Sequence, residues 1–458
     1  MITTRVQRAF VAALGALMMV GAQTSAVFAA DTTPSFKADC PPTIKCVVVP
    51  AAFTANNGNI EDYGNYDSAN RPNDMAINSI VVHDTEGDLQ SVLESFQNPT
   101  SYTSTQYVIA SDGTVYHMVP NKDVAWHAGN WWYNMHSIGI EHVGHAARGG
   151  TEYTPAMYWA SAQLVRYLTS KYHIPRDRGH ILGHDNVPAP KGTGIASMHL
   201  DPGPFWNWQN YMALIGAPIV PSGGLHDGFV TVAPMWPLSK QSVTGCWPND
   251  QACAPTGLQP TNFVYLHTEP SADAPFFTDA VLGEGSIALN TNAARLFYGQ
   301  TFALNGQPKV ERGGIWYHVW ANGGTGWFYS PWSAPTALPA SGKYITPKAG
   351  KSTIPVYGRP SPEASAYPES LLSSPPASFW IPALAPTAPL PYTVAAGQRY
   401  KVISSTNVPN DHYYTWSLTA DRSRFPYDHT VFVGETEFVQ IQYGNRIGFV
   451  NRGDVDIH

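Results

Sequence analysis

The sequence predicts an α/β domain in the first half of the chain and a β-rich region in the second half. Up to about residue 216, apolar runs of strand length alternate with runs at helical spacing, the pattern of an α/β fold. Beyond that point short aromatic strands separated by Pro and Gly turns predominate. The length of 458 residues corresponds to about three domains.

The composition argues against a nucleic-acid binder or a membrane protein. The formal net charge is -7, whereas a duplex-binding domain is usually basic. Charged residues make up 13% and aromatic residues 12%, a balance that favours a secreted protein that contacts carbohydrate. After residue 30 we find no run apolar enough for a stable membrane span. Nothing in the composition indicates an oligomeric state.

The first element, residues 1–30, resembles a secretory signal peptide. Arg5 and Arg8 precede an apolar run, VAALGALMMVGA, and the small residues of VFAA follow. We therefore expect cleavage after Ala29 or Ala30 and a secreted, extracellular or wall-associated protein. A membrane anchor is the alternative, which the shortness of the apolar run disfavours.

The next segment, residues 31–74, is expected to be mostly loop and to be closed by a local disulfide. Cys40 and Cys46 form one close pair and Cys246 and Cys253 form another, so an exported chain is expected to contain two small disulfide loops. A zinc site built from the four cysteines is the alternative, but neither pair has C-x-x-C spacing.

Residues 75–215 predict the α/β domain itself, and each element has its own signal. Thr154 and Pro155 are an N-cap and a first-turn proline for the longest helix. The Ser-Asp-Gly turn at 111–113 predicts a hairpin. In chain order we expect a strand at 78–84, a helix at 88–98, a hairpin at 107–119, a strand at 136–144, a helix at 155–172, a short strand at 180–184 and a closing helix at 205–215.

The second half of the chain predicts a linker followed by two small all-β barrels. Residues 216–254 are the linker with its local Cys pair, and residues 255–335 and 345–458 repeat one order of features. Each has a strand before a Pro-rich loop and ends with two aromatic strands joined by a Gly-containing turn. Both resemble the SH3-like barrels of bacterial wall proteins.

Three side chains at strand ends and in a DPG turn suggest a metal site. His83 and His184 each end a predicted strand, and Asp201 lies in the turn, which together give a His2Asp set suited to one hydrolytic Zn²⁺. The pair His180 and His184 at i, i+4, or His142 and His145, could form the site instead. With 16 histidines in the chain, two at strand ends could also arise by chance.

The acidic side chains that follow His83 are a separate case. Asp84, Glu86 and Asp88 are expected to form a solvated loop and a helix cap, in preference to a second metal site.

Six motifs in order carry a family resemblance over residues 75–215. They are VVHDTEG, the SDGTVY hairpin, VAWHAGN, NMHSIGIEHVG, GHDNV and HLDPGPFW. Together they resemble the type 2 N-acetylmuramoyl-L-alanine amidases, relatives of the peptidoglycan recognition proteins and of phage T7 lysozyme. The resemblance implies a mixed central sheet with flanking helices and one zinc ion held by His83, His184 and Asp201. It also implies cleavage of the amide between N-acetylmuramic acid and the L-alanine of a peptidoglycan stem peptide.

The resemblance also assigns roles to other residues, and in two places the chain departs from the family. Glu141 matches the catalytic acidic residue, and His199 stands where several relatives have Lys; it could still donate a proton or a hydrogen bond. A catalytic Tyr of the phage enzyme would fall at Thr105, so Glu141 would take over its role. In VAWHAGNWWYN, we expect Trp126, His127 and Asn134 to bind substrate, although some of these aromatics could belong to the core.

Two other functions remain as alternatives to the amidase. A recognition protein could bind peptidoglycan or muropeptides without cutting them, but this chain retains all three ligands and Glu141, which favours an enzyme. A zinc peptidase that cuts between stem amino acids is separated from the amidase only by the resemblance.

Overall fold

A six-stranded mixed sheet forms the centre of the first half of the chain. The computed structural model describes residues 36–224, 226–245, 254–373, 388–406, 408–419 and 428–458. The strands in sheet order are β1 (Cys46–Val48), β7 (Val115–His117), β6 (Tyr107–Ile109), β9 (Ser137–His142), β5 (Ser79–Val82) and β10 (Ile181–Gly183). Only β6 and β7 pair antiparallel, as the predicted hairpin; the other neighbours are parallel. The mixed sheet is therefore confirmed.

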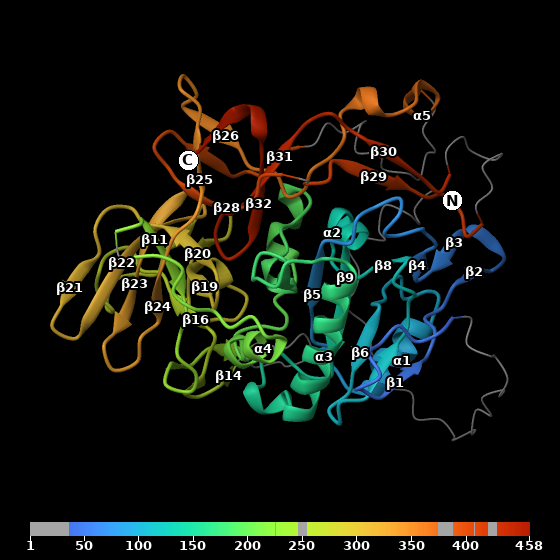
Figure 1. Cartoon of the computed structure of the whole chain (residues 1–458), viewed down its shortest axis with the longest axis horizontal. Coiled ribbons are helices and arrows are strands. Elements are labelled where there is room, and N and C mark those ends of the chain that lie inside the picture. Colours follow the sequence, from blue (N-terminus) through green and yellow to red (C-terminus); the bar gives the residue numbers. More distant parts are fainter. Residues whose placement is uncertain (1–35, 225, 246–253, 374–387, 407, 420–427) are drawn as a thin grey trace.

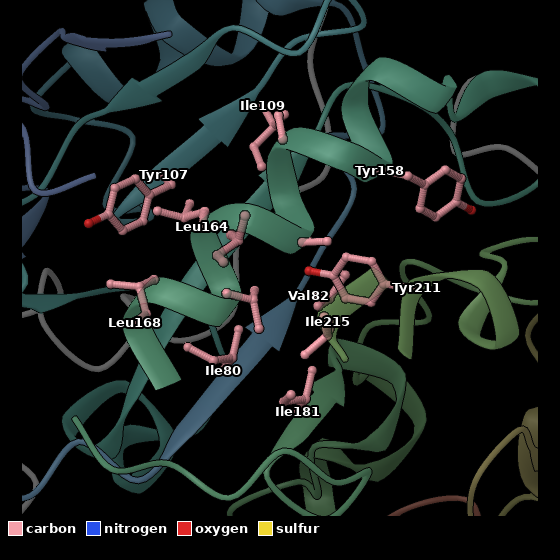
Figure 2. Close-up of a cluster of buried hydrophobic side chains, with 14 of the residues drawn as sticks. Ile80, Val82, Tyr107, Ile109, Tyr158, Leu164, Leu168, Ile181, Tyr211 and Ile215 are labelled. Carbon is pink, nitrogen blue, oxygen red and sulfur yellow. The ribbon is translucent and has the colours of Figure 1, made fainter. Parts of the chain in front are cut away.

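Two helices cover one face of this sheet and enclose the main core. Helix α3 (Pro155–Lys171) starts at the predicted N-cap, where Thr154 Oγ1 accepts from the backbone N–H of Met157, and α4 (Trp208–Ile215) closes the domain. Figure 2 shows the helix side chains packed on the strands below them. Each fully buried Leu or Ile here contributes about 1.5–3 kcal/mol. The shared core residues labelled there are Ile80, Val82, Tyr107, Ile109, Tyr158, Leu164, Leu168, Ile181, Tyr211 and Ile215.

Two shorter helices lie elsewhere in this half. Helix α1 (Leu89–Gln97) has Asp88 as its N-cap, as expected for this helical pattern. Helix α2 (Trp131–His136) was not predicted; its N-cap Asn130 accepts from the backbone N–H of Trp132.

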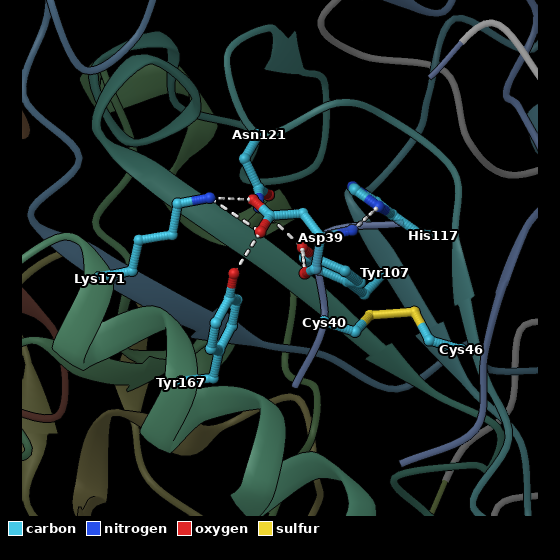
Figure 3. The surroundings of a disulfide bond; sticks show 8 residues. All are labelled: Asp39, Cys40, Cys46, Tyr107, His117, Asn121, Tyr167 and Lys171. Atoms are coloured by element: carbon cyan, nitrogen blue, oxygen red, sulfur yellow. Dashed lines mark hydrogen bonds and ion pairs between the residues drawn. A yellow bond between two sulfur atoms is a disulfide. The ribbon is translucent and has the colours of Figure 1, made fainter. Parts of the chain in front are cut away.

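The segment before residue 75 contains four short strands that the sequence does not predict, within the mostly irregular chain expected there. The disulfide Cys40–Cys46 is present, and β1 begins at Cys46 and extends the central sheet. Figure 3 shows the neighbouring Asp39, whose carboxylate accepts from Lys171, Tyr167 and Asn121. The further strands of this half are β2 (Thr54–Asn56), β3 (Asn59–Gly64), β4 (Tyr66–Asp67) and β8 (Val124–Ala125).

The first part of the second half is all β, and it starts earlier than predicted. Strand β11 (Phe229–Val232) falls inside the expected linker yet pairs with both β20 and β24 at the centre of a sheet. The expected bond between Cys246 and Cys253 lies outside the described residues. The other strands are β12 (Lys240–Gln241), β13 (Thr244–Gly245), β14 (Ala254–Pro255), β15 (Gln259–Pro260), β16 (Phe263–Tyr265), β17 (Thr278–Asp279), β18 (Gly283–Glu284), β19 (Arg295–Phe297), β20 (Thr301–Ala303), β21 (Lys309–Glu311), β22 (Gly314–Ala321), β23 (Gly324–Pro331) and β24 (Ala337–Ala340).

The second all-β unit contains a five-stranded sheet in the order β32-β31-β28-β25-β33. Both units end in the predicted pair of aromatic strands, β22 with β23 and β31 with β32. The all-β character is confirmed, whereas SH3-like barrels stay a prediction. The elements are β25 (Tyr344–Pro347), β26 (Thr353–Pro355), α5 (Glu369–Ser373), β27 (Thr393–Ala395), β28 (Tyr400–Ser404), β29 (Asp411–Tyr414), β30 (Thr430–Val433), β31 (Phe438–Gln442), β32 (Ile447–Asn451) and β33 (Val455–Ile457).

The second all-β unit packs directly on the other face of the central sheet. Val81 and Leu182, which alternate with the residues facing α3, share a buried cluster with Phe438 and Phe449. In Figure 1, β29 and β30 extend from this unit toward β3 of the N-terminal segment, where Leu418 bonds the backbone of β3. Among the described residues, no helix combines the length and apolar character needed to cross a bilayer.

Candidate metal centre and active site

The three predicted ligands meet at one edge of the central sheet. His83 follows β5 directly, and His184 follows β10, which lies beside β5 in parallel register with Gly183 opposite Val82. The carboxyl ends of neighbouring parallel strands lie at the same edge of a sheet, so the imidazoles of His83 and His184 lie close together. Asp201 reaches them from the following turn. One ligand atom from each of the three lies within 4.8 Å of the others, and all three side chains are buried.

A hydrogen-bond chain determines which nitrogen of His83 is free to bind a metal. Ser137 Oγ donates to the carbonyl of Tyr133, so it must accept the proton on His127 Nε2, 3.2 Å away. Burial, together with the facing imidazoles, holds the pKa of His127 well below its usual value, so His127 is neutral and its Nδ1 is an acceptor. His83 Nε2 therefore donates to His127 Nδ1 at 3.0 Å, which leaves Nδ1, the nitrogen that faces Asp201, as the one available to a metal.

The donor atoms at this centre are arranged so that they could bind a cation. His83 Nδ1 lies 3.0 Å from Asp201 Oδ2, and His184 Nδ1 lies 3.1 Å from Asp201 Oδ1. Burial lowers the pKa of His184 to about 3, which keeps this imidazole neutral, and its buried nitrogens have no hydrogen-bond partner among the described residues. Burial opposes ionisation of Asp201, but the facing imidazoles, His184 foremost, hold its pKa well below the usual range. The donor set therefore fits a zinc ion.

Glu141 stands beside this centre on β9. Its neighbour Ile140 is paired with Val82 of β5, so Glu141 lies at the same sheet edge as His83. Burial and the charges of Asp201 and Asp84 raise its pKa well above the usual value, and its Oε2 is buried with no hydrogen-bond partner in the described part of the chain. A carboxyl group with a raised pKa next to a metal site can accept and release a proton near neutral pH.

His199, the other predicted catalytic residue, is half exposed at the mouth of the site. Its ring stacks on that of His184 with centroids 4.5 Å apart, and its Nδ1 lies 3.6 Å from Asp201 Oδ1. The stacking places the imidazole of His199, which can donate a hydrogen bond, next to the three predicted metal ligands and leaves it half exposed.

One member of the acidic cluster after His83 differs from the solvated loop that the sequence suggests. Asp84 is buried and accepts from the hydroxyl of Tyr153, and burial together with Asp201 raises its pKa well above the usual value. Glu86 is exposed, as expected for a solvated loop. Asp88 is also exposed and caps α1, as expected. Tyr153 has no sequence signal that would link it to this cluster.

The three histidines that the sequence offers as alternative metal ligands contact other residues of the chain. His142 points to the α3 side of the sheet, where Nδ1 donates to the His83 carbonyl and Nε2 lies 2.7 Å from Ser161 Oγ. His145 contacts Glu152 at 2.8 Å, and His180 contacts Asp177 at 2.8 Å. None of the three reaches the His83–His184–Asp201 group.

The predicted substrate contacts are largely occupied by the protein's own chain. Asn134 Oδ1 accepts from the backbone N–H groups of His127 and Ala128. Both ring nitrogens of His127 contact residues of the chain, His83 and Ser137; its predicted substrate role stays a prediction. Gly139 makes room for this ring, because a Cβ there would lie 2.7 Å from it. Trp126 is partly buried and donates to Asp67 at 2.8 Å; its substrate role stays a prediction.

Two imidazoles and a carboxylate, beside a proton-carrying carboxyl group, form the kind of centre that metal-dependent hydrolases use. A family model described as N-acetylmuramoyl-L-alanine amidase matches residues 73–204, the segment that carries every ligand. N-acetylmuramoyl-L-alanine amidase A of Achromobacter lyticus is 31% identical over 154 residues, which cover 30% of this chain and 82% of that protein. The chain belongs to the N-acetylmuramoyl-L-alanine amidase family.

Other relatives match over shorter parts of their length. The 1,6-anhydro-N-acetylmuramyl-L-alanine amidase AmpD of Salmonella typhimurium is 33% identical over 118 residues, 24% of this chain and 57% of AmpD. Among solved structures, the amidase AmiD from E. coli, in complex with anhydro-N-acetylmuramic acid-L-Ala-D-gamma-Glu-L-Lys, is 24% identical with a TM-score of 0.27. That match covers 32% of this chain and 60% of AmiD, so the chain spans little more than half of these two relatives.

Proposed function

We propose that this protein is a zinc-dependent amidase that cleaves the amide between the lactyl group of N-acetylmuramic acid and L-alanine in peptidoglycan or muropeptides. The observation that carries the proposal is the convergence of His83, His184 and Asp201 within the segment that matches the family. The named activities of the Achromobacter and Salmonella relatives support the choice of bond.

His83, His184 and Asp201 would hold one zinc ion at this centre. When bound, zinc supplies a Lewis acid and lowers the pKa of a water molecule to about 7. The His127–Ser137 chain would orient the His83 ring so that its Nδ1 could bind the ion, the usual function of a hydrogen-bonded partner of a metal ligand.

Glu141 and His199 account for the proton movements. Glu141 takes a proton from the attacking water and delivers it to the amide nitrogen as the carbon–nitrogen bond breaks. His199 donates a hydrogen bond to the carbonyl oxygen as that atom gains negative charge. The products are a lactyl carboxylate and a stem peptide with a free L-alanine amine.

Purified full-length protein incubated with muropeptides, with and without a chelator, tests the proposal when the new ends are identified by mass. A lactyl carboxylate with an L-alanine amine, lost on chelation and restored by Zn²⁺, supports it. Ends within the stem peptide would indicate a zinc peptidase, and binding without cleavage a recognition protein. Cleavage that ignores the chelator would contradict the role of the metal.

We also propose that the chain is exported. The Cys40–Cys46 disulfide supports this location, because disulfides persist in oxidising compartments. N-terminal sequencing of protein recovered outside the cytoplasm is expected to begin at Ala30 or Asp31; a start at Met1 would contradict cleavage of the predicted signal peptide.

A further inference from the structure

The loop that carries two of the three metal ligands, residues 184–201, has little regular structure of its own to fix its conformation. Its regular structure is limited to short 3₁₀ turns at His184–Asn186 and Gly192–Ser197. One backbone bond joins its ends inside the domain, from Asp185 N–H to the Asp201 carbonyl at 2.8 Å. The position of His184 and Asp201 must therefore depend on what packs around the loop.

The apolar side chains of this ligand loop pack on the C-terminal all-β unit. Val187, Ala189, Ile195 and Met198 share one buried cluster with residues far along the chain. Those partners are Leu390, Phe438, Ile447 and Phe449. The cluster also contains Val81, Ala128 and Trp132 of the amidase domain, so the C-terminal unit supplies part of the surface on which the ligand loop packs.

Arg446, on the turn between β31 and β32, joins the two ends of the ligand loop. One guanidinium nitrogen donates to the carbonyls of His184 at 3.4 Å and Val187 at 2.5 Å, and the other donates to the carbonyl of His199 at 2.9 Å. His184 is a ligand and His199 is two residues from Asp201. The rigid planar guanidinium has donors on two separate nitrogens, so it can bond carbonyls at both ends of the loop in a fixed geometry that a flexible Lys ammonium does not reproduce.

The turn that presents Arg446 is itself fixed. The Asn445 carbonyl accepts from Asn186 of the ligand loop at 3.1 Å and from Gln300 of the first all-β unit at 2.8 Å. A Cβ at Gly444 would lie 1.7 Å from Asn322 Oδ1, so only glycine allows this close approach. The turn, which belongs to the second all-β unit, therefore contacts both the first all-β unit and the ligand loop.

We propose that Arg446 is a positioning residue of the metal centre, so that the C-terminal unit completes the active site and is not a detachable appendage. The inference rests on the proposed zinc site, but the residue lies outside the segment 73–204 that matches the family. Arg446 acts through the backbone of His184 and His199, and its loss would let the two ligand-bearing ends of the loop separate.

Zinc affinity of the full-length protein, measured by competition with a chromophoric chelator, tests this role. Arg446→Met is expected to weaken Zn²⁺ binding about 10–100-fold, as for other partners behind metal ligands. It should also shift the visible absorption bands of the Co²⁺-substituted protein. Arg452→Met is the matched control, because Arg452 also bonds a backbone carbonyl of the same unit, that of Val455, away from the ligand loop. This variant is expected to match the wild type.

Wild-type zinc affinity and an unchanged cobalt spectrum in Arg446→Met would overturn the proposal. Thermal unfolding of the metal-free proteins shows whether the variant is folded; if it is not, Arg446→Lys decides, with at least tenfold weaker zinc binding expected and wild-type affinity contradicting the role. If the wild type binds zinc but releases no L-alanine amine, the proposed function fails and this inference stands. If the wild type cleaves and Arg446→Met binds zinc normally, the inference alone fails.

Discussion

His127 Nδ1 lies 3.0 Å from His83 Nε2, on the side of the His83 ring opposite the metal centre. The contact fixes both the tautomer and the orientation of the ligand, because His127 is itself held by Ser137. His127, which the sequence predicts to contact substrate, thus also orients a predicted metal ligand.

Replacing His127 by Phe removes the acceptor for the His83 Nε2 proton and keeps a ring of similar size. We expect zinc affinity to fall about 10–100-fold, measured by chelator competition. His180→Gln is the control, because His180 contacts Asp177 outside the metal group. Equal zinc affinity in the wild type and His127→Phe would show that the ring packs against His83 without orienting it.

Zinc should stabilise the folded protein through Asp201. At a free zinc concentration 100 times the dissociation constant, a ligand that binds only the folded state adds about 2.7 kcal/mol to the free energy of unfolding. Thermal or urea unfolding should show this gain in the wild type and in Asp177→Asn, and lose it in Asp201→Asn, which removes the anionic ligand. The same gain in Asp201→Asn would place the zinc elsewhere.

Glu141→Gln should separate proton transfer from metal binding. The amide cannot accept a proton, so kcat on muropeptides is expected to fall about 10²–10⁴-fold. Zinc content should stay at the wild-type level, because Glu141 does not belong to the ligand group. Glu94→Gln, on the exposed side of α1, is the control and should retain full activity. A kcat near that of the wild type in Glu141→Gln would exclude Glu141 as the proton carrier.

The metal ligands could be predicted from the sequence because each one follows a local signal. His83 and His184 end apolar runs that form the buried strands β5 and β10, and parallel neighbours bring their carboxyl ends together. The mixed sheet and α3 follow equally local patterns, hydrophobic periodicity and an N-cap at Thr154.

What the sequence did not reveal depends on contacts between distant segments. Arg446 meets His184 across 262 residues, and a hairpin turn carries no sign of its partner. Helix α2 was missed because its tryptophans suggested a ligand surface, whereas the indole of Trp132 donates to the Pro409 carbonyl. Asn130, a good N-cap, was the available signal for that helix. The burial of Asp84 likewise depends on Tyr153 from another element.

The Asp39 network should make stability fall in acid. Burial opposes ionisation of Asp39, but hydrogen bonds from Lys171, Tyr167 and Asn121 outweigh it and lower the pKa of the carboxyl below 3.8. A carboxylate with a lowered pKa stabilises the fold above its unfolded pKa, and this stabilisation is lost as the pH falls through the lower, folded pKa. Asp39→Asn is therefore expected to reduce the free energy of unfolding at about pH 6 by about 1–3 kcal/mol.

The difference between Asp39→Asn and the wild type should shrink as the pH is lowered below about 4, because the wild-type carboxyl then gains its proton as well. Urea unfolding at a series of pH values measures it, with the exposed Asp273→Asn as a control that leaves the curve unchanged. If the difference in the free energy of unfolding stayed constant down to about pH 2, the hydrogen-bond donors around Asp39 would not act by stabilising its charge.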